Sequence, residues 1–147
     1  MKKFVFNLEL VLKLRKKEEE KITQELAAAQ IRYQQIMEEI KGVEAQISLN
    51  YANLKKIYSG NIDIAMITSI KLYLEKLKRD RAMLEEKAEE AASEVEEVKK
   101  RLLEAVKNRK IIEKHKENEY EKYRAEFLKN DNLIIDEISS NMKTPHL

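Results

Sequence analysis

The chain of 147 residues has no cysteine and no tryptophan, and it contains only two glycines and one proline. Without cysteine it can form no disulfide, and it offers no thiol for catalysis or metal binding. Glycine and proline mark most tight turns, so their scarcity argues against a compact domain built from many short elements. The sequence therefore favours a few long helices.

An excess of charge of one sign is also missing. Charged residues make up 38% of the chain, but Lys+Arg and Asp+Glu are interspersed and nearly cancel, which leaves a formal net charge of +2. This balance gives the chain as a whole no strong attraction to nucleic acid or to anionic lipid. We expect no nucleic-acid partner.

Long apolar runs are absent as well. The opening stretch FVFNLELVLKL is rich in large apolar residues, but Asn7, Glu9 and Lys13 interrupt it, and no small-residue cleavage site follows. No apolar run approaches the about 20 residues that a transmembrane helix needs. We expect no signal peptide and no direct membrane insertion. The apolar opening is then explained either by a partner protein or by the chain's own C-terminal helix covering it.

What the sequence does contain is a heptad pattern, in which apolar residues alternate steps of four and three. The first series consists of Ile22, Leu26, Ala29, Tyr33, Ile36, Ile40, Val43, Ile47, Leu54 and Ile57. A second series runs from Ile67 to Ile112 with few interruptions. The two series predict two long helices that each present one apolar stripe.

The interval between the two series predicts a turn. Gly60 suits a left-handed position after a helix end, and Asn61 or Asp63 can cap the next helix. Two long helices with so short a connection must fold back on each other. We therefore predict an all-α fold in one domain, residues 1–147, as a long antiparallel two-helix coiled-coil hairpin with an overhanging C-terminal helix. The expected ranges are helix 1 over about 5–58, a turn over 59–63, helix 2 over about 64–140 and a flexible tail over 141–147. Extended toward the N-terminus, the spacing of the first series reaches Arg15 and Glu19, which are polar. Counting layers from the turn sets Arg15 opposite Arg109, a layer of like charge that Glu18 or Glu113 relieves.

Residues with catalytic or metal-binding chemistry do not converge in the sequence. His115 and Glu119 stand four apart on one helix face, but metal sites usually need three or four ligands, so a solvated histidine is the favoured interpretation. The second histidine, His146, lies in the C-terminal tail. A two-helix hairpin also has no cleft that could bury a substrate. We predict that the protein is not an enzyme and that it has no cofactor, no metal and no catalytic residue.

Both ends of the chain carry groups of residues that resemble one known family. These are Phe6-x-Leu8, Val11-Leu12, Arg15 and the glutamates at 18–20, then Leu102-Leu103-Glu104, Arg109-Lys110 with Glu113-Lys114, Tyr120, Tyr123 and Asp136-Glu137. Together with the length and the position of the turn, they are similar to the flagellar FliJ family over nearly all of the chain.

The resemblance implies a non-enzymatic component of the flagellar type III protein export apparatus, needed for flagellum biogenesis and motility. Its implied location is cytoplasmic, peripheral to the membrane at the flagellar base. Its implied partners are the flagellar export ATPase hexamer, the cytoplasmic domain of the membrane export gate, and export chaperones. For the ATPase the resemblance points to Phe4, Phe6, Leu8, Leu12, Arg15, Tyr123, Asp136 and Glu137. For the export gate it points to Ile47, Tyr51, Tyr73 and Leu77.

Other functions are compatible with the same pattern. One alternative is the stalk of a virulence-type secretion ATPase, or a subunit like the central stalk of a rotary ATPase. The latter usually has an added domain, for which a short turn leaves no room. An alternative of another class is a purely structural coiled-coil spacer that dimerises through its own seam. Because the predicted seam is satisfied within one chain, we expect the isolated protein to be a monomer.

Overall fold

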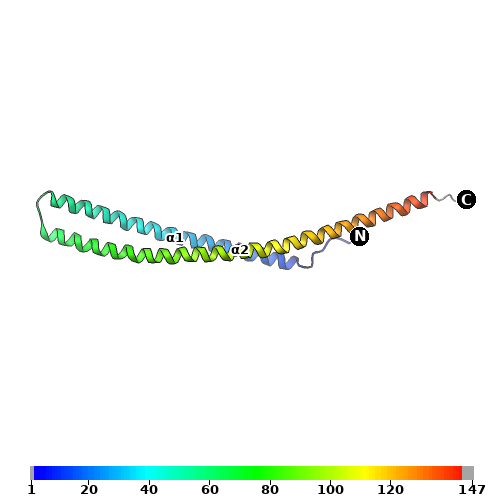
Figure 1. The fold of residues 1–147 in the computed structure, drawn as a ribbon, viewed down its shortest axis with the longest axis horizontal. Coiled ribbons are helices and arrows are strands. Elements are labelled where there is room, and N and C mark those ends of the chain that lie inside the picture. The colour runs from blue at the N-terminus through cyan, green and yellow to red at the C-terminus, as the bar shows by residue number, and fades with distance from the viewer. Residues whose placement is uncertain (1, 144–147) are drawn as a thin grey trace. The chain divides into compact units, whose positions relative to one another are not determined.

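The computed structural model describes residues 2–143, with no side-chain description for the last of these. Two helices, α1 (Glu9–Tyr58) and α2 (Ile64–Lys143), account for most of this range, and it contains no β-strand. The helices pack together as an all-α hairpin, which confirms the predicted fold class (Figure 1). The chain divides into two units. We call residues 22–102 the hairpin unit, and residues 1–21 with residues 103–147 the terminal unit.

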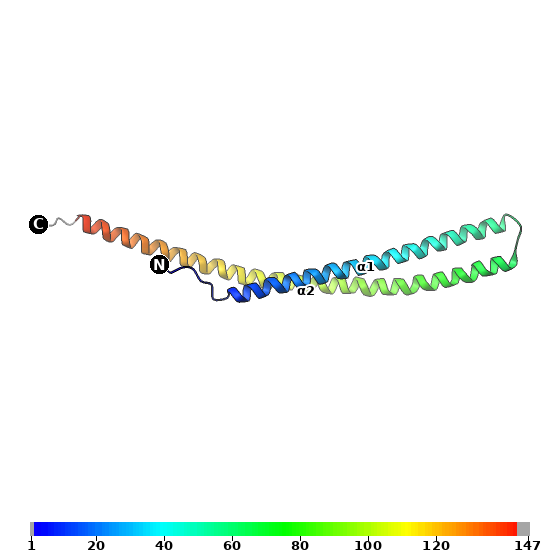
Figure 2. The same ribbon diagram turned by 180° about the vertical axis from the view of Figure 1, so that it is seen from behind.

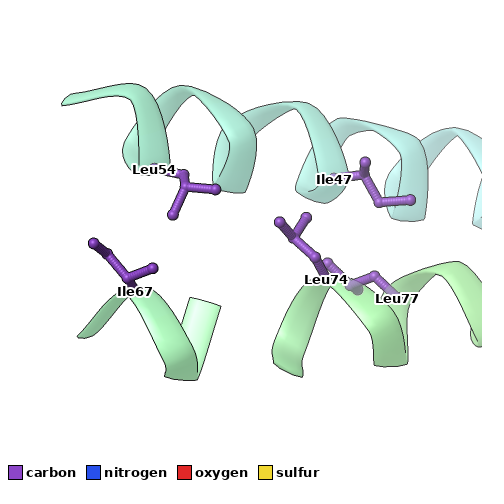
Figure 3. Packing of buried hydrophobic residues seen from close by; sticks show 5 residues of the cluster. All are labelled: Ile47, Leu54, Ile67, Leu74 and Leu77. Atoms are coloured by element: carbon purple, nitrogen blue, oxygen red, sulfur yellow. The ribbon is translucent and has the colours of Figure 1, made fainter. Parts of the chain in front are cut away.

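The core of the hairpin unit lies between its two antiparallel helices. Figure 3 shows that side chains from α1 and α2 point toward one another across this seam, and the cluster consists of Ile47, Leu54, Ile67, Leu74 and Leu77. Val43, Ile57 and Ile70 pack against it. These residues stand at the predicted heptad positions, so burial of one apolar stripe per helix holds the two helices together.

Farther from the turn, the same seam is built from smaller side chains. The buried residues there include Ala29, Ala88 and Ala91. Two ion pairs bridge the helices beside them, one between Arg32 Nη1 and Glu94 Oε2 at 2.8 Å and one between Arg101 Nη2 and Glu25 Oε2 at 2.8 Å. Because all four charged groups keep much of their contact with water, each pair stabilises the unit by less than about 1 kcal/mol.

The end of α1 differs from the prediction made for Gly60. No described residue, glycine included, has a positive φ, so Gly60 is not in the left-handed conformation and that prediction is wrong. Instead, the amide of Gly60 donates to the carbonyl of Ile57 at 3.3 Å, and the hydroxyl of Ser59 donates to the carbonyl of Lys56 at 3.0 Å. A tightened last turn and the Ser59 hydroxyl thus satisfy carbonyls at the end of α1. In a left-handed glycine motif, backbone amides after the helix would donate to such carbonyls instead.

The start of α2 is capped by Asp63, one of the two residues that the sequence offered for this position. Its Oδ1 accepts hydrogen bonds from the backbone amides of Ala65 at 3.1 Å and Met66 at 3.3 Å. These two amides belong to the first turn of the helix and have no carbonyl partner within it. An aspartate at this position also places its negative charge at the positive end of the helix dipole.

The start of α1 lies at Glu9, later than the expected start at about residue 5. Residues 2–6 are not helical, and they run beside α2 within the terminal unit (Figure 2). Phe4 and Phe6 point toward α2 while Val5 between them is exposed. Side chains two apart share a side only in an extended segment, because a helix would turn them by about 200°. Packing of both rings on α2 therefore excludes a helical start.

The other end of the terminal unit is helical as far as Lys143. The tail expected over residues 141–147 is thus helical at its beginning, and residues 144–147, including His146, lie outside the described residues. From Arg124 to Met142 every side chain except that of Ser139 is exposed. No helix in the described part of the chain has a segment long and apolar enough to cross a membrane.

A single charge placed in the seam tests the importance of the buried stripe. Ile40 is buried on α1, whereas Ile31 on the same helix is 59% exposed. We predict that Ile40→Asp lowers the free energy of unfolding by about 3 kcal/mol, because it buries an unpaired carboxylate. Ile31→Asp should change it by less than about 0.5 kcal/mol. Urea unfolding followed by circular dichroism measures both values, and equal losses in the two variants would contradict the seam.

Candidate partner-binding surfaces

The N-terminal aromatic residues pack on α2 within the terminal unit. Phe4 lies edge-on to Tyr120, with ring centroids 5.3 Å apart, and it also contacts Tyr123 at 5.5 Å. Phe6 packs on the ring of His115 at 5.6 Å. The hydroxyl of Tyr123 donates to the backbone carbonyl of Lys2 at 2.6 Å. The extended opening is therefore held by aromatic contacts and by one hydrogen bond.

Burial separates the predicted ATPase-binding residues of this segment into two groups. Phe6 is 7% exposed and Leu12 is 2% exposed, whereas Phe4 and Leu8 are partly buried. Of the two explanations for the apolar opening, the structure shows packing on the chain's own C-terminal helix. Phe6 and Leu12 consequently offer almost no surface to a partner while this packing persists. Arg15, in contrast, is exposed on α1.

His115 belongs to this aromatic packing. Groups of three or more His, Cys, Asp or Glu residues that could hold a metal ion do not occur within residues 2–143. The ammonium group of the next residue, Lys116, lies 6.0 Å from the centroid of the Phe6 ring. At that distance a cation is attracted to the face of the aromatic ring.

Carboxylates relieve the charge of Arg109, the residue that the layer count set opposite Arg15, and Glu113 is one of the two residues expected in that role. The Nε of Arg109 donates to Glu19, and its Nη1 donates to Glu113 Oε2 at 2.7 Å. The hydrogen bond with Glu19 and then that with Glu113 raise the pKa of Arg109 above its ordinary value. Glu19 also stands at a polar position of the predicted seam. The seam thus continues into the terminal unit through opposite charges, which avoids the repulsion of two facing arginines.

A second ion pair in the terminal unit joins the first turn of α1 to α2. Lys116 Nζ lies 2.8 Å from Glu9 Oε2. The hydrogen bond from Lys116 lowers the pKa of Glu9 below its ordinary value, and the positive charges of Lys116, Lys13 and Lys16 act in the same direction. Because Glu9 is the first residue of α1, this pair ties the beginning of the helix to α2.

The C-terminal part of α2 carries a broad apolar face without a described partner. Its large exposed residues on one side of the helix are Phe127, Leu128, Ile134, Ile135, Ile138 and Met142, whereas Leu133 is exposed on the opposite side. The two acidic candidates, Asp136 and Glu137, are also exposed. None of these apolar residues was among the predicted binding residues, and Leu128 and Ile135 stand seven residues apart. The spacing of seven between those two residues is the signal that could have identified them.

The predicted gate-binding residues lie in the hairpin unit, but they do not form one patch. Ile47 and Leu77 belong to the buried core, while Tyr51 and Tyr73 are 46% and 41% exposed. Lys78 Nζ lies 5.4 Å from the centroid of the Tyr51 ring. Since Tyr73 precedes Lys78 by five residues, the two point about 140° apart around α2. The tyrosines therefore flank the seam on different sides.

An open groove of about 470 Å³ adjoins this part of the hairpin unit. Its lining includes Gly42, Val43, Leu77 and Met83. A Cβ atom added to Gly42 would meet no neighbouring atom within 4 Å, so the missing side chain leaves room beside the helix. Leu77 is largely buried, but part of its side chain lines the groove, where an apolar side chain of a partner can contact it.

The ion pair of Glu9 predicts a measurable shift on mutation. We expect Lys116→Gln to raise the pKa of Glu9 toward its ordinary value, because the first cause of its lowering is removed. The folded-state pKa is depressed, so the pair's stabilisation is complete above the unfolded-state pKa and is lost as the pH falls through the folded-state value. NMR titration of the Glu9 carboxyl carbon measures this shift.

Lys122→Gln is the matched control, since Lys122 pairs with Glu119 at 3.6 Å on the same helix. This variant should leave the titration of Glu9 unchanged. An unaltered pKa of Glu9 in Lys116→Gln would contradict the interaction. The wild type should also lose more stability than Lys116→Gln on acidification from neutral pH to about pH 3, because only the wild type gives up the pair.

The family model described as "Flagellar FliJ protein" matches residues 4–143. Comparisons with curated proteins and with solved structures gave no match.

Proposed function

Because the chain belongs to the flagellar FliJ family and is thus a flagellar export-related protein, we propose that it is a non-enzymatic stalk of the type III export apparatus. In this role it engages the hexameric export ATPase and the cytoplasmic domain of the membrane export gate, and it escorts export chaperones. It acts in the cytoplasm, peripheral to the membrane at the flagellar base. The observation that carries the proposal is the family match over residues 4–143.

The surface proposed for the ATPase is the exposed end of the terminal unit. Apolar residues near the centre of an interface supply most of its binding energy when a partner covers them. Ile134, Ile135 and Ile138 fit this description, because they are large and more than half exposed. Asp136 and Glu137 stand between these residues in the sequence but point to other sides of the helix, where their charge guides orientation more than affinity. Arg15 adds a positive group on α1.

The members of the predicted ATPase set that take part in packing within the terminal unit receive a different part in the proposal. Phe4, Phe6, Leu12 and Tyr123 hold the opening segment against α2, so they position the surface that the ATPase meets. Leu8, which is partly buried, lies at the boundary between the two groups. Loss of Phe6 would therefore act on binding through the packing of the terminal unit.

The surface proposed for the export gate lies in the hairpin unit around Tyr51 and the nearby groove. Half-exposed aromatic residues are favoured binding anchors, and tyrosine adds a hydroxyl that can form a hydrogen bond with a partner. Tyr73 lies on another flank, so a partner that contacts both tyrosines must reach around the hairpin. Ile47 and Leu77 support this surface from the core, and Leu77 also lines the groove.

The test of the ATPase surface replaces apolar anchors on α2. Ile134→Ser with Ile138→Ser should weaken binding to the export ATPase by about 2 kcal/mol, roughly 30-fold in Kd, because two anchors lose their apolar contact. Leu103→Ser with Ile111→Ser is the control, since both residues are similarly exposed on the same helix. Isothermal titration calorimetry measures Kd, and circular dichroism checks helix content. Equal weakening by both double variants would overturn the assigned surface.

The gate surface is tested separately, with the isolated cytoplasmic domain of the export gate. Tyr51→Ala should reduce affinity about tenfold or more, as expected for a binding anchor, and should change stability by less than about 1 kcal/mol. Leu49→Ala, which changes an exposed residue on another side of α1, should leave affinity unchanged. Unchanged affinity in Tyr51→Ala would remove this residue from the interface, whatever the result for the ATPase.

A further inference from the structure

The turn-proximal end of the hairpin unit differs in composition from the rest of the chain. Between Glu44 and Glu75 the only charged residues are Lys55, Lys56, Asp63 and Lys71, whereas 38% of the whole chain is charged. We call residues 45–74 the hairpin end. A surface helix pair normally keeps its outer faces charged, so this depletion indicates that the outer faces here meet something other than bulk water.

The residues at the turn itself are large, apolar and exposed. Ile62 is 63% exposed and Ile64 is 76% exposed, and Tyr58 and Met66 on either side are also at least half exposed. Turns normally carry polar residues, because they face solvent. None of these four side chains is needed to close the turn, since Asp63, Ser59 and backbone hydrogen bonds already satisfy its polar groups. Their apolar character therefore requires another explanation.

The charges beside these residues are two lysines, Lys55 and Lys56, and one aspartate, Asp63, whose Oδ1 caps α2. Lys55 and Lys56 form the last turn of α1, directly before Tyr58. The carboxylate of Asp63 is engaged by the amides of Ala65 and Met66. The hairpin end thus presents an apolar tip next to two lysines and a tyrosine, the combination found where protein meets the headgroup region of a lipid bilayer.

We propose that the hairpin end docks on an anionic membrane surface, with Ile62 and Ile64 in the boundary between headgroups and acyl chains and with Lys55 and Lys56 at the lipid phosphates. The contact is shallow and involves no spanning segment, in keeping with the absence of a membrane-crossing helix among the described residues. It departs from the expectation of no membrane insertion, which rested on the opening stretch and on the net charge of the whole chain. Neither of those features describes the turn.

The spacing along the helices fits a contact of this depth. Apolar groups of interfacial segments reach about 5–10 Å into the boundary region. Tyr51 precedes Tyr58 by seven residues, which is about 10 Å along α1 at 1.5 Å per residue. Tyr51 therefore stays at or above the headgroups when the turn is immersed. The surface proposed for the export gate and the surface proposed for lipid can then be occupied together.

A bilayer is favoured over a protein pocket because the apolar residues lie on a projecting turn. A protein partner would have to supply a deep apolar pocket for Ile62 and Ile64 and counter-charges for Lys55 and Lys56. An anionic bilayer provides both, since its phosphates attract lysines and its acyl region accepts side chains of any shape.

A single tryptophan reporter tests the contact, because the natural chain has no tryptophan. Ile62→Trp places the reporter at the turn, and Met83→Trp places it at a similarly exposed position of α2 outside the hairpin end. The full-length variants are mixed with vesicles of phosphatidylcholine alone or of phosphatidylcholine with phosphatidylglycerol. With anionic vesicles we expect the tryptophan emission of the Ile62→Trp variant to shift to the blue and to be quenched by brominated acyl chains. The Met83→Trp variant should show neither effect.

The lysines are tested by vesicle sedimentation of the protein without a reporter. Each lysine near an anionic surface contributes about fivefold to partitioning, so Lys55→Gln with Lys56→Gln should reduce it by roughly 30-fold. Lys16→Gln with Lys17→Gln changes two adjacent exposed lysines of the terminal unit and should have little effect. Circular dichroism verifies that every variant is folded.

Three outcomes would overturn the proposal. They are the absence of binding to anionic vesicles, equal emission shifts from both reporters, and equal losses from both lysine pairs. If the tryptophan emission of the Ile62→Trp variant does not change with vesicles but shifts when the export-gate domain binds, the tip fits a protein pocket instead. Because the vesicles contain no protein, a negative result leaves the proposed stalk function untouched.

Discussion

Within residues 2–143, each helix can bury only one stripe against another helix, because the structure describes just two helices there. The stripe is supplied by residues such as Leu54 and Ile67 in the hairpin unit and by Leu12 and Ala105 in the terminal unit. Every other large apolar side chain must face outward or find a partner elsewhere. In a chain so rich in charge, the places where apolar residues gather outside the stripe therefore identify the surfaces on which function can depend.

Opposite charges continue the seam where apolar residues no longer fill it. Arg109 is only partly exposed, and it bridges Glu19 from α1 and Glu113 from its own helix. A guanidinium can serve two carboxylates at once because its donors spread in a plane. This arrangement keeps the helices in register in the terminal unit, where side-chain burial is less regular than near the turn.

Much of this architecture could be predicted from the sequence, and the failures have identifiable causes. The heptads located Leu54 and Ile67 because a two-helix seam has a single period, and that period persists through many turns. The extended opening was missed because alternation over only three residues, with Phe4 and Phe6 on one side, is too short to outweigh a helical pattern. The prediction of a left-handed Gly60 failed for a different reason, because a helix can also end through a tightened last turn.

The partner surfaces could be predicted only in part, because exposure depends on tertiary contacts. Phe6 and Ile135 are both large apolar residues outside the main heptads, yet the first is buried and the second is 61% exposed. The difference arises because residues 2–6 fold back on α2 and cover only the part of it that they reach. The relief of the Arg109 charge by Glu113 could be predicted from the spacing of four residues on one helix, whereas the pairing of Arg109 with Glu19 depends on how side chains of two helices meet.

The separation between paired residues grows steadily with distance from the turn, and this has a consequence for how the protein folds. The Arg32–Glu94 pair closes a loop of 62 residues, and the Arg109–Glu19 pair closes one of 90. Each doubling of loop length adds only about 0.6 kcal/mol to the entropic cost of closing the loop directly. If the helices pair from the turn outward, however, the first step closes only a short loop. The buried cluster that includes Leu54 and Ile67 stands next to that first loop. The two helices can thus pair progressively, starting beside the turn at residues 59–63, and the N-terminal aromatic segment packs on α2 last.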